Sequence, residues 1–209
     1  MTLTLLHTAE AHRAAFDDLA AQIAPEAQLR HVVRPDWLSR AQAADAALQG
    51  EIAQAVREAR GAVLCTCTTL GPMAEGLGIL RIDAPMMTKA AQIAADARGD
   101  IVMAYCLDST LAPSAALLDR ALERAGHTAR VHALSLGQFW PLFGAGQIAP
   151  FHAVIASAIR ENLSAAPGAA CVVLAQASMA GAAPLLAGVG VPVLAAPEMA
   201  LRAALDLPN

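Results

Sequence analysis

Aromatic and charged residues are scarce in this 209-residue chain. Aromatic residues make up 3% of the sequence and charged residues 15%, and the formal net charge is −4. No run of lysines and arginines marks a surface for nucleic acid or for an acidic membrane. Few aromatic rings are present on which bases could stack. We therefore expect no nucleic-acid partner.

Cysteine is also scarce, and its spacing is unlike that of common zinc sites. The four cysteines are Cys65, Cys67, Cys106 and Cys171. Cys65 and Cys67 are separated by one residue, whereas common zinc-ligand pairs are separated by two or more. The sequence predicts no metal site, and we expect the reduced thiols of a cytoplasmic protein.

Long uninterrupted apolar segments are absent as well. The N-terminus has no basic region and no cleavage site of a signal peptide, and we interpret it as a first strand. The apolar region from Cys171 to Leu205 is divided by glycines and prolines into short elements, so we expect no membrane span. No glycine-rich phosphate loop is present, which disfavours a nucleotide-binding α/β protein.

Predicted strands and helices alternate along the chain, which is typical of an α/β fold with parallel sheets. The expected strands cover residues 2–6, 29–33, 62–67, 79–83, 100–105, 129–135, 171–175 and 191–195. The expected helices cover residues 9–23, 38–59 with an interruption near Gly50, 85–98, 113–125 beginning at Pro113, 151–165 and a last one from Pro197.

One stretch, Ala62 to Gly71, combines a buried strand with chemistry-bearing residues. Its apolar start is followed by Cys67, Thr68 and Thr69 and then by a turn. Ligands bind at the carboxyl ends of strands in open α/β sheets. A thiol there, at a helix N-terminus, could serve as nucleophile or base with a lowered pKa. The alternative is a small buried apolar residue followed by helix caps.

The two halves of the sequence match each other. The segment that ends at Leu70 aligns with the segment that ends at Met179 when Cys67 is set on Gln176, an offset of 109 residues. A repeat of this length predicts two similar lobes. We expect a first lobe over residues 1–98, joined by the C-terminal helix 197–209, and a second lobe over residues 99–196.

Five motifs spread over nearly the whole chain carry a resemblance to a known family. They are Leu6-His7-Thr8, Cys67-Thr68-Thr69, Arg81-Ile82-Asp83-Ala84-Pro85-Met86, Ser109-Thr110-Leu111-Ala112-Pro113 and Leu174-Ala175-Gln176-Ala177-Ser178-Met179. With these motifs the chain resembles the aspartate/glutamate/hydantoin racemase superfamily, which also holds arylmalonate decarboxylases and maleate isomerases. The resemblance implies two pseudo-symmetric α/β lobes, an active-site cleft between them, and chemistry beside a carboxylate without pyridoxal phosphate, metal or other cofactor.

The resemblance also suggests roles for Cys67 and Gln176. In such racemases a cysteine from each lobe flanks the substrate carbon, one removing a proton and the other returning one. Cys67 stands at the first-lobe position and Gln176 at the second, where glutamine has no proton to exchange near neutral pH. We therefore expect a cofactor-independent isomerase with a single cysteine acid/base acting on a small carboxylate. A one-cysteine decarboxylase of a malonate-type acid and a non-catalytic carboxylate-binding protein are the alternatives, and a homo-oligomer is possible.

An enediolate formed beside a carboxylate needs several hydrogen-bond donors. The candidates for substrate binding are Thr8, Thr68, Thr69, Tyr105, Ser109, Thr110, Ala177 and Ser178. Cys65 is the alternative thiol if the register shifts, whereas Cys106 and Cys171 are expected to pack in the core. Three further residues have open roles. Gln176 could instead satisfy loop backbone, His152 could cap a helix or lie on the surface, and Asp83 could fix a loop or act as a supporting acid.

Overall fold

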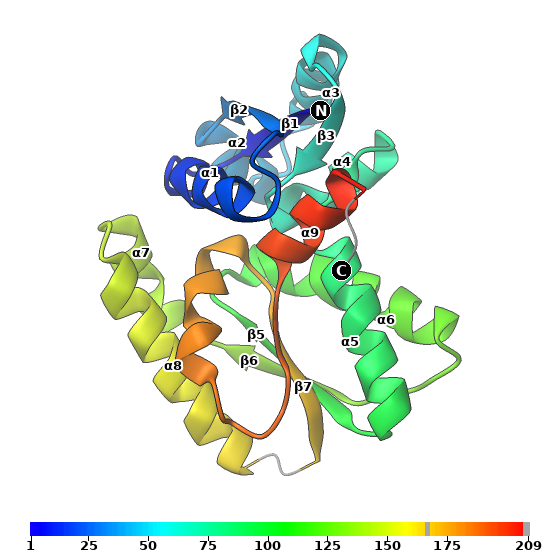
Figure 1. The fold of residues 1–209 in the computed structure, drawn as a ribbon, viewed down its shortest axis with the longest axis vertical. Helices are drawn as coiled ribbons and strands as arrows, with labels where there is room; N and C mark the ends of the chain where they lie inside the picture. The colour runs from blue at the N-terminus through cyan, green and yellow to red at the C-terminus, as the bar shows by residue number, and fades with distance from the viewer. Residues whose placement is uncertain (166–167, 207–209) are drawn as a thin grey trace. The chain divides into compact units, whose positions relative to one another are not determined.

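The computed structural model describes residues 1–165 and 168–206, which form an α/β fold with two sheets of four parallel strands each (Figure 1). The first sheet has the order β2-β1-β3-β4. Its strands are β1 (Thr2–His7), β2 (Gln28–Val33), β3 (Ala62–Cys65) and β4 (Leu80–Arg81). The helices that accompany it are α1 (Ala11–Ile23), α2 (Asp36–Gln42), α3 (Leu48–Glu58) and α4 (Gly71–Gly76).

The second sheet repeats this order as β6-β5-β7-β8. Its strands are β5 (Asp100–Tyr105), β6 (Val131–Ser135), β7 (Ala169–Leu174) and β8 (Val193–Ala195). Its helices are α5 (Ala84–Ala97), α6 (Asp108–Arg124), α7 (Trp140–Gly144) and α8 (Ile148–Ala165), and α9 (Ala196–Ala204) follows β8. Figure 1 shows α5 and α6 on one face of this sheet and α8 on the other. The predicted α/β class with two pseudo-symmetric parallel-sheet lobes is confirmed.

Contacts along the chain group it into two compact units. Residues 1–84 with 197–206 form the first unit, and residues 85–196 form the second. The chain passes from one unit to the other at two similar steps, Ala84-Pro85 and Ala196-Pro197. Helix α5 follows strand β4 of the first unit but belongs to the second unit. Helix α9 follows strand β8 of the second unit but belongs to the first unit.

Each unit buries both faces of its sheet, as parallel sheets require. In the first unit, Trp37 of α2 and Leu48 and Ile52 of α3 pack with Leu6 and Cys65 on one face. In the second unit, the apolar face of α8, with Phe151, Ile155 and Ile159, packs on strands β5 and β7. Among the described residues, no helix combines the length and the apolar character needed to cross a membrane.

The expected interruption at Gly50 is wrong, because the helical region breaks between α2 and α3 at residues 43–47. Ala44 has a positive φ of 53°, a conformation that ends a helix. Asp45 then fixes the break, because its Oδ1 accepts the N–H of Ala47 at 2.9 Å and its Oδ2 accepts Arg40 Nε at 2.7 Å. A side chain that satisfies backbone donors ends the helix here, whereas Gly50 lies inside α3.

The expectation that Pro113 begins a helix is also wrong. Helix α6 begins five residues earlier, at Asp108, and holds Pro113 in its interior. Leu107 has an extended backbone and its carbonyl accepts the Thr110 N–H at 2.9 Å, which forms the first turn. The first turn of α6 forms before Pro113, so the missing backbone donor of this proline does not prevent the helix from starting at Asp108. Ser109 and Thr110 consequently lie in a helical first turn and not in a loop.

Candidate functional site

Cys67 lies two residues beyond the end of β3. The Thr66 N–H still donates to the Leu6 carbonyl at 3.0 Å, after which the chain leaves the sheet. Cys67 keeps an extended backbone and precedes the short 3-10 helix η1 (Thr68–Leu70), and its carbonyl accepts the Leu70 N–H at 3.1 Å. The thiol is therefore held at the carboxyl end of a central parallel strand, on a tight turn.

Burial raises the pKa of the Cys67 thiol above its ordinary value. The hydroxyls of Thr8 and Thr69 and the N–H groups of Leu70 and Thr69 act in the opposite direction and do not outweigh the desolvation. The lowered thiol pKa expected from a helix N-terminus is therefore wrong. The physical reason is that η1 has three residues, too few for a strong helix dipole, while desolvation by burial is the largest influence on the thiol.

The other cysteines lie deeper. Cys65 is buried in β3, its Sγ lies 3.6 Å from the Cys67 carbonyl oxygen, and burial raises its pKa to about 12. Cys106 and Cys171 are buried in the second unit, where desolvation raises their pKa values to about 12 and about 11. All four thiols are free. Cys67 is the one among them that is partly exposed.

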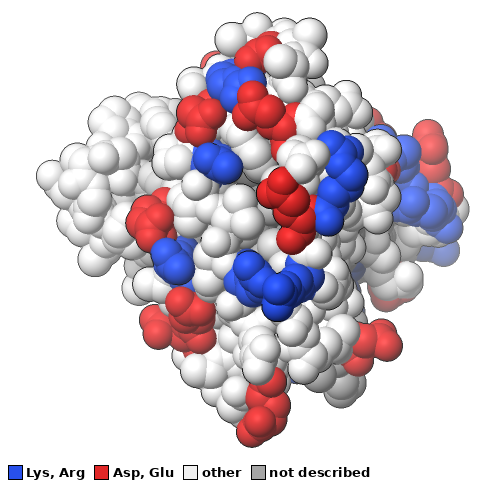
Figure 2. Space-filling view, turned by 90° about the horizontal axis from the view of Figure 1, so that it is seen from above, with Lys and Arg blue, Asp and Glu red and all other residues white. Residues whose placement is uncertain are grey.

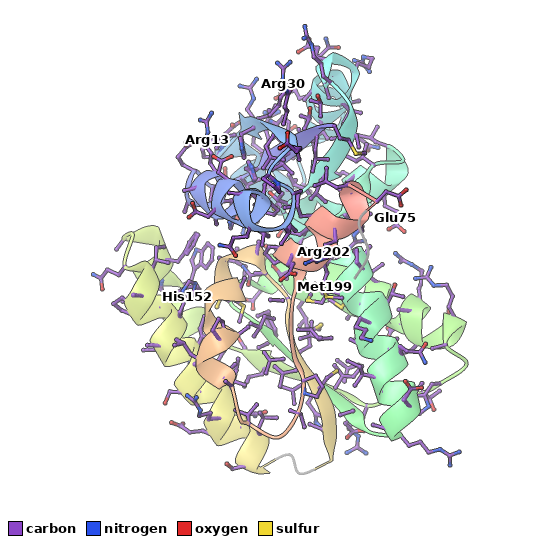
Figure 3. The ribbon with its side chains drawn as sticks, viewed as in Figure 1. Arg13, Arg30, Glu75, His152, Met199 and Arg202 are labelled. Carbon is purple, nitrogen blue, oxygen red and sulfur yellow. The ribbon has the colours of Figure 1, made fainter. Side chains whose placement is uncertain are left out.

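A buried arginine supports the turn that follows Cys67. Arg81 of β4 is 4% exposed and donates from Nε and Nη2 to the two carboxylate oxygens of Asp83, at 3.0 and 2.8 Å. Its Nη1 donates to Glu75 of α4 at 3.1 Å, and Figure 3 labels Glu75. A Cβ on Gly71 would lie 2.6 Å from Arg81 Nε, so the guanidinium lies directly against the end of η1. Sequence reasoning quoted this motif but did not single out Arg81. The Arg-x-Asp spacing, which places both side chains on one face of a strand, was the available signal.

Gln176 occupies in the second unit the position that Cys67 has in the first. It lies two residues after β7, has an extended backbone, and precedes the 3-10 helix η3 (Ala177–Ala182). The hydrogen bonds repeat as well. Ala175 N–H donates to the Ala104 carbonyl at 2.9 Å, and Met179 N–H donates to the Gln176 carbonyl at 3.0 Å. These two bonds are equivalent to the Thr66 and Leu70 bonds beside Cys67.

The side-chain amide of Gln176 is held in one orientation. Its Oε1 accepts the backbone N–H groups of Cys106 and Leu107, at 2.6 and 3.0 Å, just past the end of β5. The oxygen thus satisfies loop backbone, which was one of the two roles considered from the sequence. Because the oxygen is occupied, the Nε2 group is left as a donor, and it makes no hydrogen bond to any of the described residues.

The residues after Gln176 are supported by α8. His152 lies within α8 and its Nε2 donates to the Ser178 carbonyl at 2.9 Å (Figure 3). The imidazole also lies against Gly181, where a Cβ would approach ring atoms to 2.3 Å. Ser178 is 7% exposed, and within the described residues its Oγ is buried without a hydrogen-bond partner. A buried hydroxyl without a partner is uncommon in proteins and can mark a ligand contact.

The remaining predicted residues divide between the two units. Thr8 and Thr69 lie beside the Cys67 thiol, and Thr68 is buried in η1. Tyr105 is buried at the end of β5, where its carbonyl accepts the Leu136 N–H at 2.7 Å. Two further candidates lie in the second unit, Thr110 buried in α6 and Ala177 at the start of η3. Among the described residues, no three His, Cys, Asp or Glu side chains are grouped as a metal ion would require.

Sequence reasoning missed one polar cluster, formed by the side chains of Asp17, His31, His7 and Thr66. His7 is fully buried and directly precedes Thr8, and Thr66 directly precedes Cys67. The only sequence signal was a histidine at the polar end of an otherwise apolar strand. Its partners come from α1, β2 and the segment after β3, which local patterns do not bring together.

Comparison with known proteins finds similarity in structure only. No family model matches the sequence, and no curated protein matches it. A glutamate racemase from Francisella tularensis, in complex with D-glutamate, superposes with a TM-score of 0.69 at 10% identity, over 98% of this chain and 80% of that one. An allantoin racemase from Klebsiella pneumoniae gives 0.64 at 17% identity, over 99% and 86%. An arylmalonate decarboxylase gives 0.60 at 14% identity, over 99% and 92%.

The chain has the fold of these racemases and decarboxylases. The resemblance inferred from the five motifs is thereby confirmed at the level of the fold. Identities of 10–17% carry the architecture and leave the reaction to be argued from the residues of this chain.

Proposed function

We propose that this protein is an enzyme of racemase or decarboxylase type that transfers a proton at the carbon α to the carboxylate of a small acid. Cys67 is its single acid/base. The observation that carries the proposal is the equivalence of Cys67 and Gln176, each two residues past a central strand and directly before a 3-10 helix. One repeat therefore offers a thiol where the other offers an amide.

A single thiol limits the stereochemistry of the reaction. Racemisation requires one group that accepts a proton on one face of the carbon and another that donates on the opposite face. Gln176 has no proton to exchange, and its orientation suits donation of a hydrogen bond from Nε2 to a substrate oxygen. The amide then stabilises negative charge on that oxygen, and proton transfer is confined to the face that Cys67 meets.

The raised pKa of Cys67 favours decarboxylation as the second candidate function. A thiol that stays protonated at neutral pH is poised to donate a proton rather than to remove one. In a malonate-type acid, the bond from the α-carbon to one carboxylate breaks and its electron pair forms an enediolate, with release of CO₂. The Cys67 S–H proton then goes to the α-carbon, and the resulting thiolate recovers a proton from water.

The test uses a panel of small carboxylic and malonic acids in D₂O. Incorporation of deuterium at the α-carbon is followed by NMR, and CO₂ release by a pH-indicator assay. We expect one or both activities in the native protein and a loss of at least about 100-fold in Cys67→Ala, the lower range for removal of a general acid or base. Cys171→Ala, which removes a thiol buried in β7, is the matched control and should retain activity.

Each outcome distinguishes between the possible functions of the protein. Deuterium exchange without CO₂ release identifies an isomerase-type enzyme, and CO₂ release with uptake of one solvent hydrogen identifies a decarboxylase. Activity that survives in Cys67→Ala would overturn the role of this thiol. Acids that raise the melting temperature but undergo neither reaction would instead indicate a carboxylate-binding protein.

A further inference from the structure

Four side chains of the first unit form a continuous hydrogen-bonded chain. The Thr66 hydroxyl donates to the Leu6 carbonyl at 2.9 Å, and His7 Nδ1 lies 2.8 Å from the Thr66 oxygen. His7 Nε2 lies 2.8 Å from His31 Nδ1, and His31 Nε2 lies 2.9 Å from Asp17 Oδ1. The chain therefore runs from an exposed carboxylate on α1 to a buried hydroxyl next to Cys67.

The acceptor at the exposed end sets the direction of the last bond. An ionised Asp17 only accepts, so His31 Nε2 donates to it. One proton lies between His7 Nε2 and His31 Nδ1. At the buried end, the Thr66 hydroxyl oxygen lies within hydrogen-bond distance of both the Leu6 carbonyl and His7 Nδ1.

The surroundings of His7 disfavour a charge on its ring. Burial, together with His12, His31 and Arg13, lowers the pKa of His7 to about 3, so His7 stays neutral near neutral pH. His31 faces Asp17, whose side chain is 56% exposed. Phe16, also from α1, packs against the His7 ring at 5.5 Å between ring centroids and keeps that side apolar.

We propose that Asp17, His31 and His7 are positioning residues that hold the polar ends of β1 and β3 through this continuous chain of hydrogen bonds. The chain is anchored on Thr66, which precedes Cys67, and on His7, which precedes Thr8, whose hydroxyl faces the Cys67 sulfur. Its relevance to catalysis rests on the proposed function. The hydrogen-bonded chain and its effect on Cys67 reactivity do not depend on that function.

The first test detects the hydrogen-bonded chain directly by NMR of the protein labelled with ¹⁵N-histidine, at pH 7. We expect His31 Nε2 to carry a proton, as the donor to Asp17. In Asp17→Ala this bond is lost, and the ring resonances of both His31 and His7 should shift because the two rings share one hydrogen bond. Asp18→Asn removes a charge one residue away and should leave both rings unchanged. Ring resonances of His7 that stay the same in Asp17→Ala would overturn the continuity of the chain.

The second test measures positioning by the rate at which iodoacetamide alkylates Cys67, read by mass spectrometry. Asp17→Ala removes the last acceptor of the chain, and we expect the rate to change by about two- to tenfold, the range of one altered hydrogen bond. Asp17→Asn, which retains the bonds, should stay within about twofold of the native rate, as should Asp18→Asn. Equal rates in Asp17→Ala and the native protein would overturn the positioning role. Because no substrate is used, neither result depends on the proposed enzyme activity.

Discussion

At the scale of single residues, the amide of Gln176 has two separate functions. Its oxygen satisfies two backbone N–H groups at the end of β5, and its nitrogen remains available as a donor. The first function is structural, because buried backbone donors without partners are costly. The second belongs to the proposed reaction. Substitutions that keep the side-chain oxygen of Gln176 and remove its nitrogen can therefore separate the structural function from the function in the proposed reaction.

Gln176→Leu should destabilise the protein, whereas Gln176→Glu should not. Leucine has a similar volume but leaves the N–H groups of Cys106 and Leu107 without an acceptor, at a cost of about 1–3 kcal/mol for each group that stays unsatisfied. Glutamate keeps an acceptor oxygen at the same position. Urea unfolding followed by circular dichroism measures the difference. Equal midpoints for the two variants would show that water replaces the lost acceptor.

At the scale of secondary-structure elements, the Cys67 turn depends on close contact between η1, α4 and β4. Arg81 is fixed from three sides by Asp83, Glu75 and the backbone of Gly71. A buried guanidinium must keep its partners because an unpaired buried charge is strongly unfavourable. A glycine is therefore required at position 71 because the Arg81 guanidinium leaves no space for a side chain. Its backbone angles do not require glycine, because its φ is −49°.

Gly71→Ala and Gly50→Ala should have opposite effects on stability. The added methyl group at Gly71 would meet Arg81 Nε at 2.6 Å, and we expect a loss of about 1–3 kcal/mol. Gly50 lies within α3 with nothing within 4 Å of a Cβ, so alanine there should gain about 0.5–1 kcal/mol. Thermal and urea unfolding of both variants provide the check. A neutral Gly71→Ala would mean that Arg81 moves without losing its ion pairs.

At the scale of the whole molecule, acidic and basic side chains are interspersed on the face seen in Figure 2. Arg40, for example, pairs with Asp36, Asp45 and Glu51. Exposed pairs of this kind contribute little to stability and titrate far from neutrality. The pH dependence of folding near neutral pH therefore depends on buried groups, and two histidines of the first unit stand out.

Stability should fall as the pH decreases below about 6.5. Burial lowers the pKa of His7 to about 3 and that of His12 to about 4, from an ordinary value of 6.5. Between these values the unfolded chain binds protons that the native protein does not, so the free energy of unfolding rises with pH and decreases in acid. The loss begins near pH 6.5 and is complete near pH 3–4. Urea unfolding from pH 4 to pH 8 measures it.

His12→Gln should reduce this dependence, because one of the two groups no longer takes up a proton on unfolding. Gln22→Ala, on an exposed position of α1, removes no titratable group and serves as the control, which should leave the slope unchanged. An unaltered slope in His12→Gln would show that His12 is protonated in the native protein. His7 is left in place because its substitution would also break the hydrogen-bonded chain to His31.

The sequence by itself determined the α/β class, the two parallel sheets and the 109-residue repeat that sets Cys67 on Gln176. These features follow from local patterns, since short apolar runs alternating with helical segments are typical of α/β folds with parallel sheets. The register confirms the repeat. Leu6 pairs with Cys65 in the first sheet, and Ala104 pairs with Leu174 in the second.

Only the tertiary structure decided the protonation and orientation of the polar groups. The partners of His7 and Gln176 lie 24 to 70 residues away in sequence, and no periodicity encodes such contacts. The Cys67 pKa also depends on desolvation, which is a property of the packed environment and not of neighbouring residues in the chain. Helix α6 begins before Pro113 for a similar reason, because the end of β5 delivers the chain to a first turn that forms at Asp108. Local sequence thus specifies which residues end the strands, and long-range packing specifies how those residues are charged, oriented and held.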